Sequence, residues 1–102
     1  MSQQIEYKRS RKTHYIFVSG YFTFSLHDEF RDSYRDTHDV DEYIVDLSEV
    51  EYIDSSALGM LLLLKERAEQ NDASVTIANP SRQIQNILDI ANFRKLFTIS
   101  DT

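Results

Sequence analysis

Residues 44–64, with the sequence IVDLSEVEYIDSSALGMLLLL, predict a strand that leads into a helix, and the rest of the chain is organised around this unit. The stretch opens with a short apolar run, which is typical of a buried strand. Residues 48–51 are mostly polar and are predicted to form a connector. The Asp-Ser-Ser sequence at 54–56 offers side-chain oxygens to the unpaired N–H groups of a helix start, and good helix formers follow it, with Gly59 the one weak position.

The serine pair in this unit allows two interpretations. Either Ser55 or Ser56 serves only as the N-cap of the helix, which is the commoner role for a serine in such a place. Alternatively, one of them is a regulated phosphate acceptor, because the positive end of a helix favours an anion. The residue types alone favour the cap.

The segment Asp-Ser-Ser-Ala-Leu-Gly at 54–59, preceded by a Val-Asp-Leu strand, resembles the signature of the STAS domain, and in particular that of the bacterial anti-sigma-factor antagonists. The family's usual sequence is Asp-Ser-Ser/Thr-Gly-Leu-Gly, so Ala57 stands where glycine is usual. The Asn-Pro-Ser sequence at 79–81, which opens a third helix, and the hydrophobic turn at 93–97 also resemble the family. The resemblance implies an α/β STAS fold, with a mixed sheet of four to five strands and helices packed mainly on one face.

The same resemblance implies a partner-switching role. The unphosphorylated protein would bind an anti-sigma factor that carries a serine-kinase domain, and this would release the client of that factor. Phosphorylation would end the binding, and a PP2C-type phosphatase would restore it. The family's acceptor is generally the first residue after the aspartate, which maps to Ser55, with Ser56 as the fallback. The alternative is a constitutive STAS subunit of a membrane-transport ATPase complex, as in lipid trafficking, in which the serine is structural.

The second predicted helix carries more apolar residues than one buried stripe requires. The expected core stripe consists of Ala57, Leu61, Leu64 and Ala68, with Met60 on its flank. Leu58, Leu62 and Leu63 lie away from that stripe. Either neighbouring helices cover these three leucines, or the leucines form an apolar docking site beside the serine pair.

An aromatic cluster, Tyr21, Phe22 and Phe24, follows Gly20 where relatives usually carry a Gly-Glu-Leu/Ile-Asp pattern, so the acids of that pattern are not carried over. The cluster either packs in the core or forms a docking surface. The complete predicted partner-binding surface comprises Tyr21, Phe22, Asp54, Ser55, Ser56, Ala57, Leu58, Met60 and Leu62.

The remaining elements follow from local patterns. Strands Ile5–Ser10 and Thr13–Ser19 are predicted to form a hairpin, and its turn region holds four of the eleven Lys and Arg residues. Ser25 is predicted to cap the first helix. The buried stripe of that helix is predicted to be Leu26, Phe30 and Tyr34. A further strand is expected at 74–78, and residues 93–99 are expected to close the core with an edge strand.

Length and composition exclude several function classes. We expect residues 1–102 to form a single STAS domain, because domains commonly have about this length. A net charge of −6 argues against nucleic-acid binding, and the absence of cysteine excludes disulfides. The longest apolar run, Met60–Leu64, is too short to insert into a membrane, and no signal-peptide pattern is present. The three histidines are isolated and no Gly-rich phosphate loop occurs, so we expect no enzyme activity, metal or cofactor, and a cytoplasmic protein that is monomeric when free.

Overall fold

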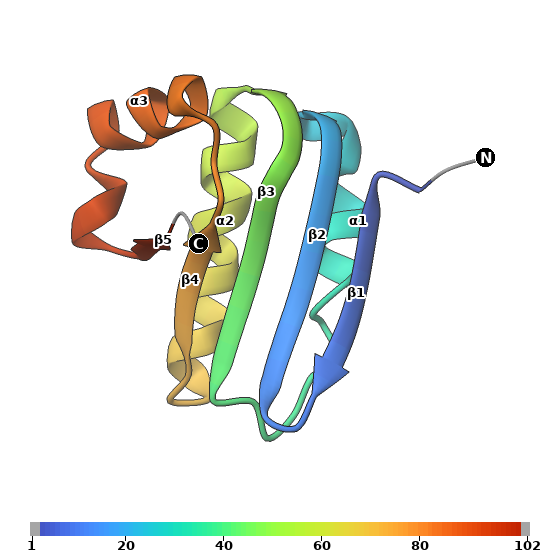
Figure 1. Cartoon of the computed structure of the whole chain (residues 1–102). Coiled ribbons are helices and arrows are strands. Elements are labelled where there is room, and N and C mark those ends of the chain that lie inside the picture. Colours follow the sequence, from blue (N-terminus) through green and yellow to red (C-terminus); the bar gives the residue numbers. More distant parts are fainter. Residues whose placement is uncertain (1–2, 101–102) are drawn as a thin grey trace.

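Five strands form one sheet in the order β1-β2-β3-β4-β5, as seen in Figure 1. The strands are β1 (Ile5–Ser10), β2 (Thr13–Phe22), β3 (Glu42–Ile53), β4 (Ser74–Ala78) and β5 (Thr98–Ser100). β1 is antiparallel to β2, and all later neighbours are parallel. This computed structural model describes residues 3–100.

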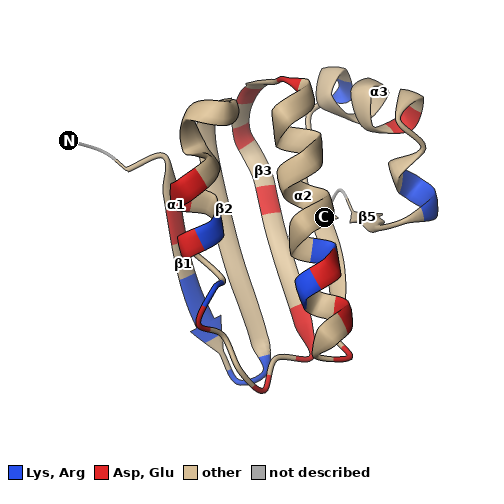
Figure 2. Cartoon of the chain, turned by 180° about the vertical axis from the view of Figure 1, so that it is seen from behind, with Lys and Arg blue, Asp and Glu red and all other residues tan. Residues whose placement is uncertain are grey.

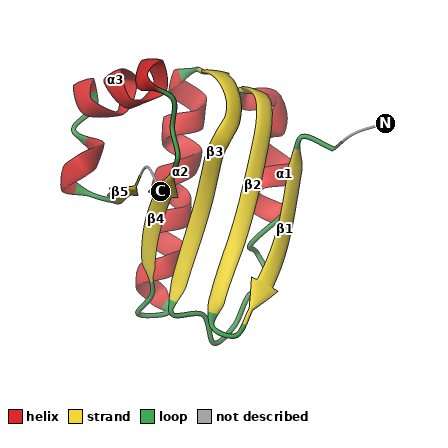
Figure 3. Cartoon of the chain, viewed as in Figure 1, coloured by secondary structure: helices red, strands yellow, loops and turns green. Residues whose placement is uncertain are grey.

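The helices α1 (His27–Asp32) and α2 (Ser55–Gln70) lie together behind one face of the sheet, as Figure 3 shows, and α3 (Arg82–Ile90) lies beside the β4 end. The opposite face of the sheet is open (Figure 1). The expected mixed α/β sheet with helices mainly on one face is confirmed.

The core lies between the sheet and the two central helices, and its residues follow the periodicity of each element. Alternate residues of β2 and β3 point toward the helices, among them Ile16, Val18, Val45 and Leu47, and all are buried. The predicted stripes are confirmed. Their buried residues are Leu26 just before α1, Phe30 within it and Tyr34 just after it, and Ala57, Leu61, Leu64 and Ala68 on α2.

Two local predictions are wrong. Residues 48–51 are not a connector, because β3 continues to Ile53 by pairing with an extended β2 that ends at Phe22. Ser25 does not cap the first helix. A 3-10 turn at Phe24–Leu26 comes first, and the Ser25 hydroxyl lies 3.0 Å from the hydroxyl of Thr23.

Side chains of β2 and α2 hold the segment that follows α1 in place, because they donate hydrogen bonds to its backbone carbonyls. His14 on β2 donates from Nε2 to the Ser33 carbonyl at 2.6 Å, while its Nδ1 is buried without a partner. Arg67 on α2 donates to the carbonyls of Arg35 and Thr37 at 3.0 and 3.1 Å. Burial lowers the pKa of His14 below its ordinary value, so the imidazole is held neutral.

Acidification should therefore destabilise the fold through His14. Below an unfolded pKa of about 6.5 the unfolded chain binds more protons than the folded one, so stability present above that pH is lost as the pH falls. Urea unfolding between about pH 7.5 and pH 5.5 measures this loss. We expect His14→Gln to cost about 1–3 kcal/mol at the higher pH and to flatten the pH dependence. His38→Gln, at an exposed histidine, is the control and should keep the dependence. An unchanged pH dependence in His14→Gln would contradict this assignment.

Candidate functional site

The N-terminus of α2 lies where β2 and β3 end. The Asp54 N–H donates to the Phe22 carbonyl at 3.4 Å, which joins the ends of the two strands. The Asp54 carboxylate accepts the N–H of Ala57 at 3.0 Å, so Asp54 is the N-cap of the helix. The interpretation of Ser55 or Ser56 as the cap is therefore wrong, because the preceding aspartate already fills that position.

The two serines are the first and second residues of α2. Ser55 is exposed and Ser56 is half-buried. Within residues 3–100, neither hydroxyl makes a side-chain hydrogen bond, and the backbone N–H groups of both residues find no acceptor. The site therefore presents an accessible hydroxyl beside unpaired donors at the positive end of a 16-residue helix.

Burial corrects the predicted partner-binding surface. Phe22 and Ala57 are fully buried and Met60 is 3% exposed, so their side chains belong to the core. The Phe22 ring packs 5.2 Å from the ring of Phe30, while α2 turns Ala57 and Met60 toward the protein interior. The predicted residues that remain accessible are Tyr21, Asp54, Ser55, Ser56, Leu58 and Leu62.

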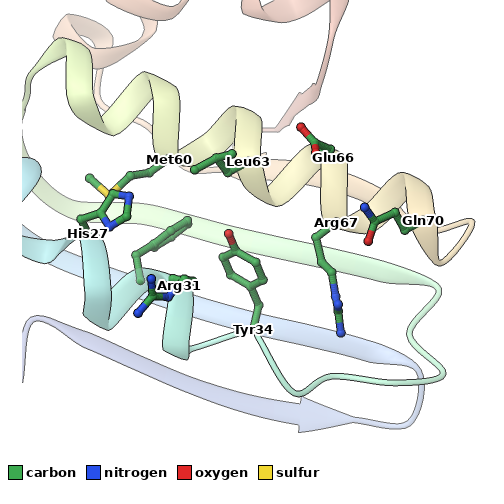
Figure 4. Close-up of a pocket in the computed structure, with 9 residues that line it drawn as sticks. His27, Arg31, Tyr34, Met60, Leu63, Glu66, Arg67 and Gln70 are labelled. Atoms are coloured by element: carbon green, nitrogen blue, oxygen red, sulfur yellow. The ribbon is translucent and has the colours of Figure 1, made fainter.

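A shallow groove of about 200 Å³ runs between α1 and α2 (Figure 4). Leu63, which is 50% exposed, lies on its α2 side, and Arg31 lies on its α1 side. Tyr34 projects into the groove, and burial raises the pKa of this phenol. α1 therefore covers Leu63 only in part, and Leu62 is also 40% exposed. The leucines are recognisable as candidates in the sequence, whereas the groove depends on how the two helices pack and has no local sequence pattern.

Three acids, Glu49, Glu51 and Asp54, lie at this end of the molecule, and residues 36–64 contain no Lys or Arg. The other acids of that range are Asp46 within β3 and, at the opposite hairpin end of the sheet, Asp36, Asp39, Asp41 and Glu42. Figure 2 shows acidic segments where β3 leads into α2. In residues 3–100, no group of His, Asp and Glu side chains is arranged to hold a metal ion. Nor is any helix there both long and apolar enough to cross a membrane.

Comparison with known proteins places this architecture in a family. The family model described as "Mlab, STAS domain" matches residues 5–98. The chain belongs to the STAS-domain family. A STAS-domain containing protein of Pseudomonas aeruginosa strain UCBPP-PA14 is 46% identical over 86 residues, which cover 83% of this chain and 85% of that protein. The family membership expected from residues 54–59 is thus confirmed.

Solved structures share the STAS fold at low sequence identity. A proposed anti-sigma factor antagonist of Thermotoga maritima has a TM-score of 0.85 at 19% identity, covering 96% of this chain and 86% of that chain. The phosphorylated form of SpoIIAA, a Bacillus cell-fate determinant, has a TM-score of 0.68 at 14% identity, covering 95% and 91%. At these identities the comparison shows the fold.

The assignment of the cap to Asp54 can be tested by stability measurements. Asp54→Ala should lower the free energy of unfolding by about 0.5–2 kcal/mol, because the Ala57 N–H loses its acceptor. Ser55→Ala, at an exposed hydroxyl without a partner, should change it by less than about 0.5 kcal/mol. Urea unfolding measures both. Equal losses in the two variants would show that Ser55 shares the capping role.

The two glycines should respond to substitution in opposite directions. Gly59 is exposed on α2, and an added Cβ would meet nothing within 4 Å, so Gly59→Ala should stabilise the protein by up to about 1 kcal/mol. Gly20 has a φ of +74°, and an added Cβ would lie 2.9 Å from Gln4 Nε2, so Gly20→Ala should destabilise it. Thermal unfolding tests both. Destabilisation by Gly59→Ala would mean that this helix face is not free in the isolated protein.

Proposed function

We propose that this protein is a phosphorylation-controlled partner-switching module of the anti-sigma-factor antagonist type. In its unphosphorylated form it binds an anti-sigma factor with a serine-kinase domain and so releases the client of that factor. The kinase phosphorylates Ser55 and ends the binding, and a PP2C-type phosphatase restores it. The observation that carries this proposal is the Asp54 cap, which leaves the exposed Ser55 hydroxyl without a structural task.

Exposure favours Ser55 over Ser56 as the acceptor, since Ser56 is half-buried against the protein. A phosphate adds roughly −1.5 to −2 charges beside Asp54. The unpaired N–H groups at the start of α2 stabilise part of that charge, so phosphorylation should change the fold little. The structure of SpoIIAA in its phosphorylated form supports this expectation, because that protein has the same fold.

The main effect of the phosphate should fall on the interface. A kinase that modifies Ser55 brings its nucleotide phosphates to this end of α2, so a phosphate already present meets like charge there. Like charges in a desolvated contact cost several kcal/mol, and each 1.4 kcal/mol is about tenfold in affinity. We therefore expect a loss of about two to three decades in affinity. The contact surface is the exposed edge from Asp54 to Leu58, extended by Leu62 and Tyr21.

The alternative function is a constitutive subunit of a membrane-transport ATPase complex. The exposure of Leu62 and Leu63 along α2 is compatible with a permanent contact. In such a subunit Ser55 would be structural, and its unused hydroxyl argues against that role. The two functions differ in whether a negative charge at position 55 ends the binding of the partner.

Matched variants, recovered from native cells and analysed by quantitative mass spectrometry, test the proposal. Ser55→Ala should retain a protein with a serine-kinase domain, and Ser55→Asp should lose it. Ser10→Asp is the charge control, since Ser10 is exposed in the hairpin between β1 and β2 at the far end of β2 from the site, and it should retain the partner. Equal recovery of a transporter ATPase with all three variants would favour the constitutive subunit and contradict the switch.

A further inference from the structure

Two tyrosines project into solvent side by side at the end of the sheet that leads into α2. Tyr21 is 61% exposed and Tyr52 is 46% exposed. They are register partners on β2 and β3, and their ring centroids are 5.7 Å apart. The hydrogen bond from Asp54 N–H to the Phe22 carbonyl joins the chain just beyond each tyrosine. The pair is therefore built into the same end of the molecule as Ser55.

Strand alternation turns Tyr21 outward, because the buried residues Ile16, Val18 and Phe22 of β2 share one face and Tyr21 lies on the other. The register of β2 against β3 shifts between Phe17 and Ser19 and again between Gly20 and Tyr21. Gly20 has a positive φ, which an L side chain rarely adopts. Both shifts place an extra residue in β3, so its buried residues become Val50 and Ile53 and Tyr52 faces solvent beside Tyr21. The next residue, Phe22, is fully buried, so the core obtains its aromatic ring there while Tyr21 stays in solvent.

The surroundings of the tyrosine pair are acidic. Glu51 and Asp54 flank Tyr52 in sequence, and Glu49 pairs in register with Ser19. Residues 13–30, like residues 36–64, contain no Lys or Arg. A contrast lies on the same sheet, where the Lys8 ammonium sits 5.4 Å from the ring centroid of Tyr15. Within residues 3–100, no cation lies over the rings of the tyrosine pair in this way.

We propose that the Tyr21–Tyr52 pair is a docking point for arginine side chains of a basic segment on the protein partner. This proposal rests on the proposed function, since it describes the surface of that partner. Aromatic faces attract cations, and guanidinium groups stack on them better than ammonium groups. Neighbouring carboxylates also attract positive charge, so the exposed rings and the acidic residues together favour an arginine-rich segment.

Titration of the isotope-labelled, unphosphorylated full chain with a hexa-arginine peptide tests this assignment by NMR. We expect the changes in chemical shift to be concentrated in residues 20–22 and 49–54, and hexa-arginine to bind more tightly than hexa-lysine. The double variant Tyr21→Ala, Tyr52→Ala should weaken hexa-arginine binding by about 4- to 25-fold, which corresponds to about two- to fivefold per ring. Tyr7→Ala is the matched control. Tyr7 is 60% exposed but is followed directly by Lys8 and Arg9, so its removal should leave the affinity within about twofold.

Equal affinity of the double variant and the parent would overturn the proposal. So would shifts concentrated in the acidic loop at 36–42, or equal binding of the two peptides. The titration contains no kinase and no phosphate, so its failure would leave the switch at Ser55 untouched. Conversely, an unmodified Ser55 in cells would not alter the peptide result.

Discussion

The hydrogen bond from the Ala57 N–H to the Asp54 carboxylate is the interaction on which the site depends. It fixes where α2 begins, and the Asp54 N–H also holds the end of β2 through the Phe22 carbonyl. Because the aspartate caps the helix, the hydroxyls of the two serines that follow it make no hydrogen bond within residues 3–100. A hydroxyl at a helix N-terminus can change its charge state by modification without removing a cap, and this separates regulation from stability.

The arrangement of charge adds a second constraint. At the hairpin end of the sheet, Arg9 donates to the carbonyls of His38 and Asp39, and Lys12 pairs with the Asp39 carboxylate at 3.9 Å. The basic residues of the hairpin thus offset the acidic loop beside them. At the α2 end, Glu49 and Glu51 have no nearby partner in their own chain segment, since residues 36–64 hold no cation. The unpaired acids Glu49 and Glu51 therefore lie at the same end of the molecule as Ser55.

Most of the fold could be predicted from local sequence, because strand alternation and helix stripes are determined by residues close together in the chain. The core residues of α2 and the strand-to-helix motif at 54–59 are examples. The extension of β3 through 48–51 could not be predicted, since it depends on pairing with β2 more than 25 residues earlier. The exposure of Tyr52 depends on the extra residues that β3 carries where it pairs with β2, which no local pattern reveals. The exposure of Leu63 likewise depends on how far α1 reaches across α2.

The central claim is that Ser55 changes its charge state in the cell. Intact-mass spectrometry on protein from its native cells, followed by peptide mapping, tests this claim most directly. The account predicts a species heavier by one phosphate, with the phosphate on Ser55. A single unmodified species under several growth conditions would contradict the switch and favour a constitutive assembly subunit.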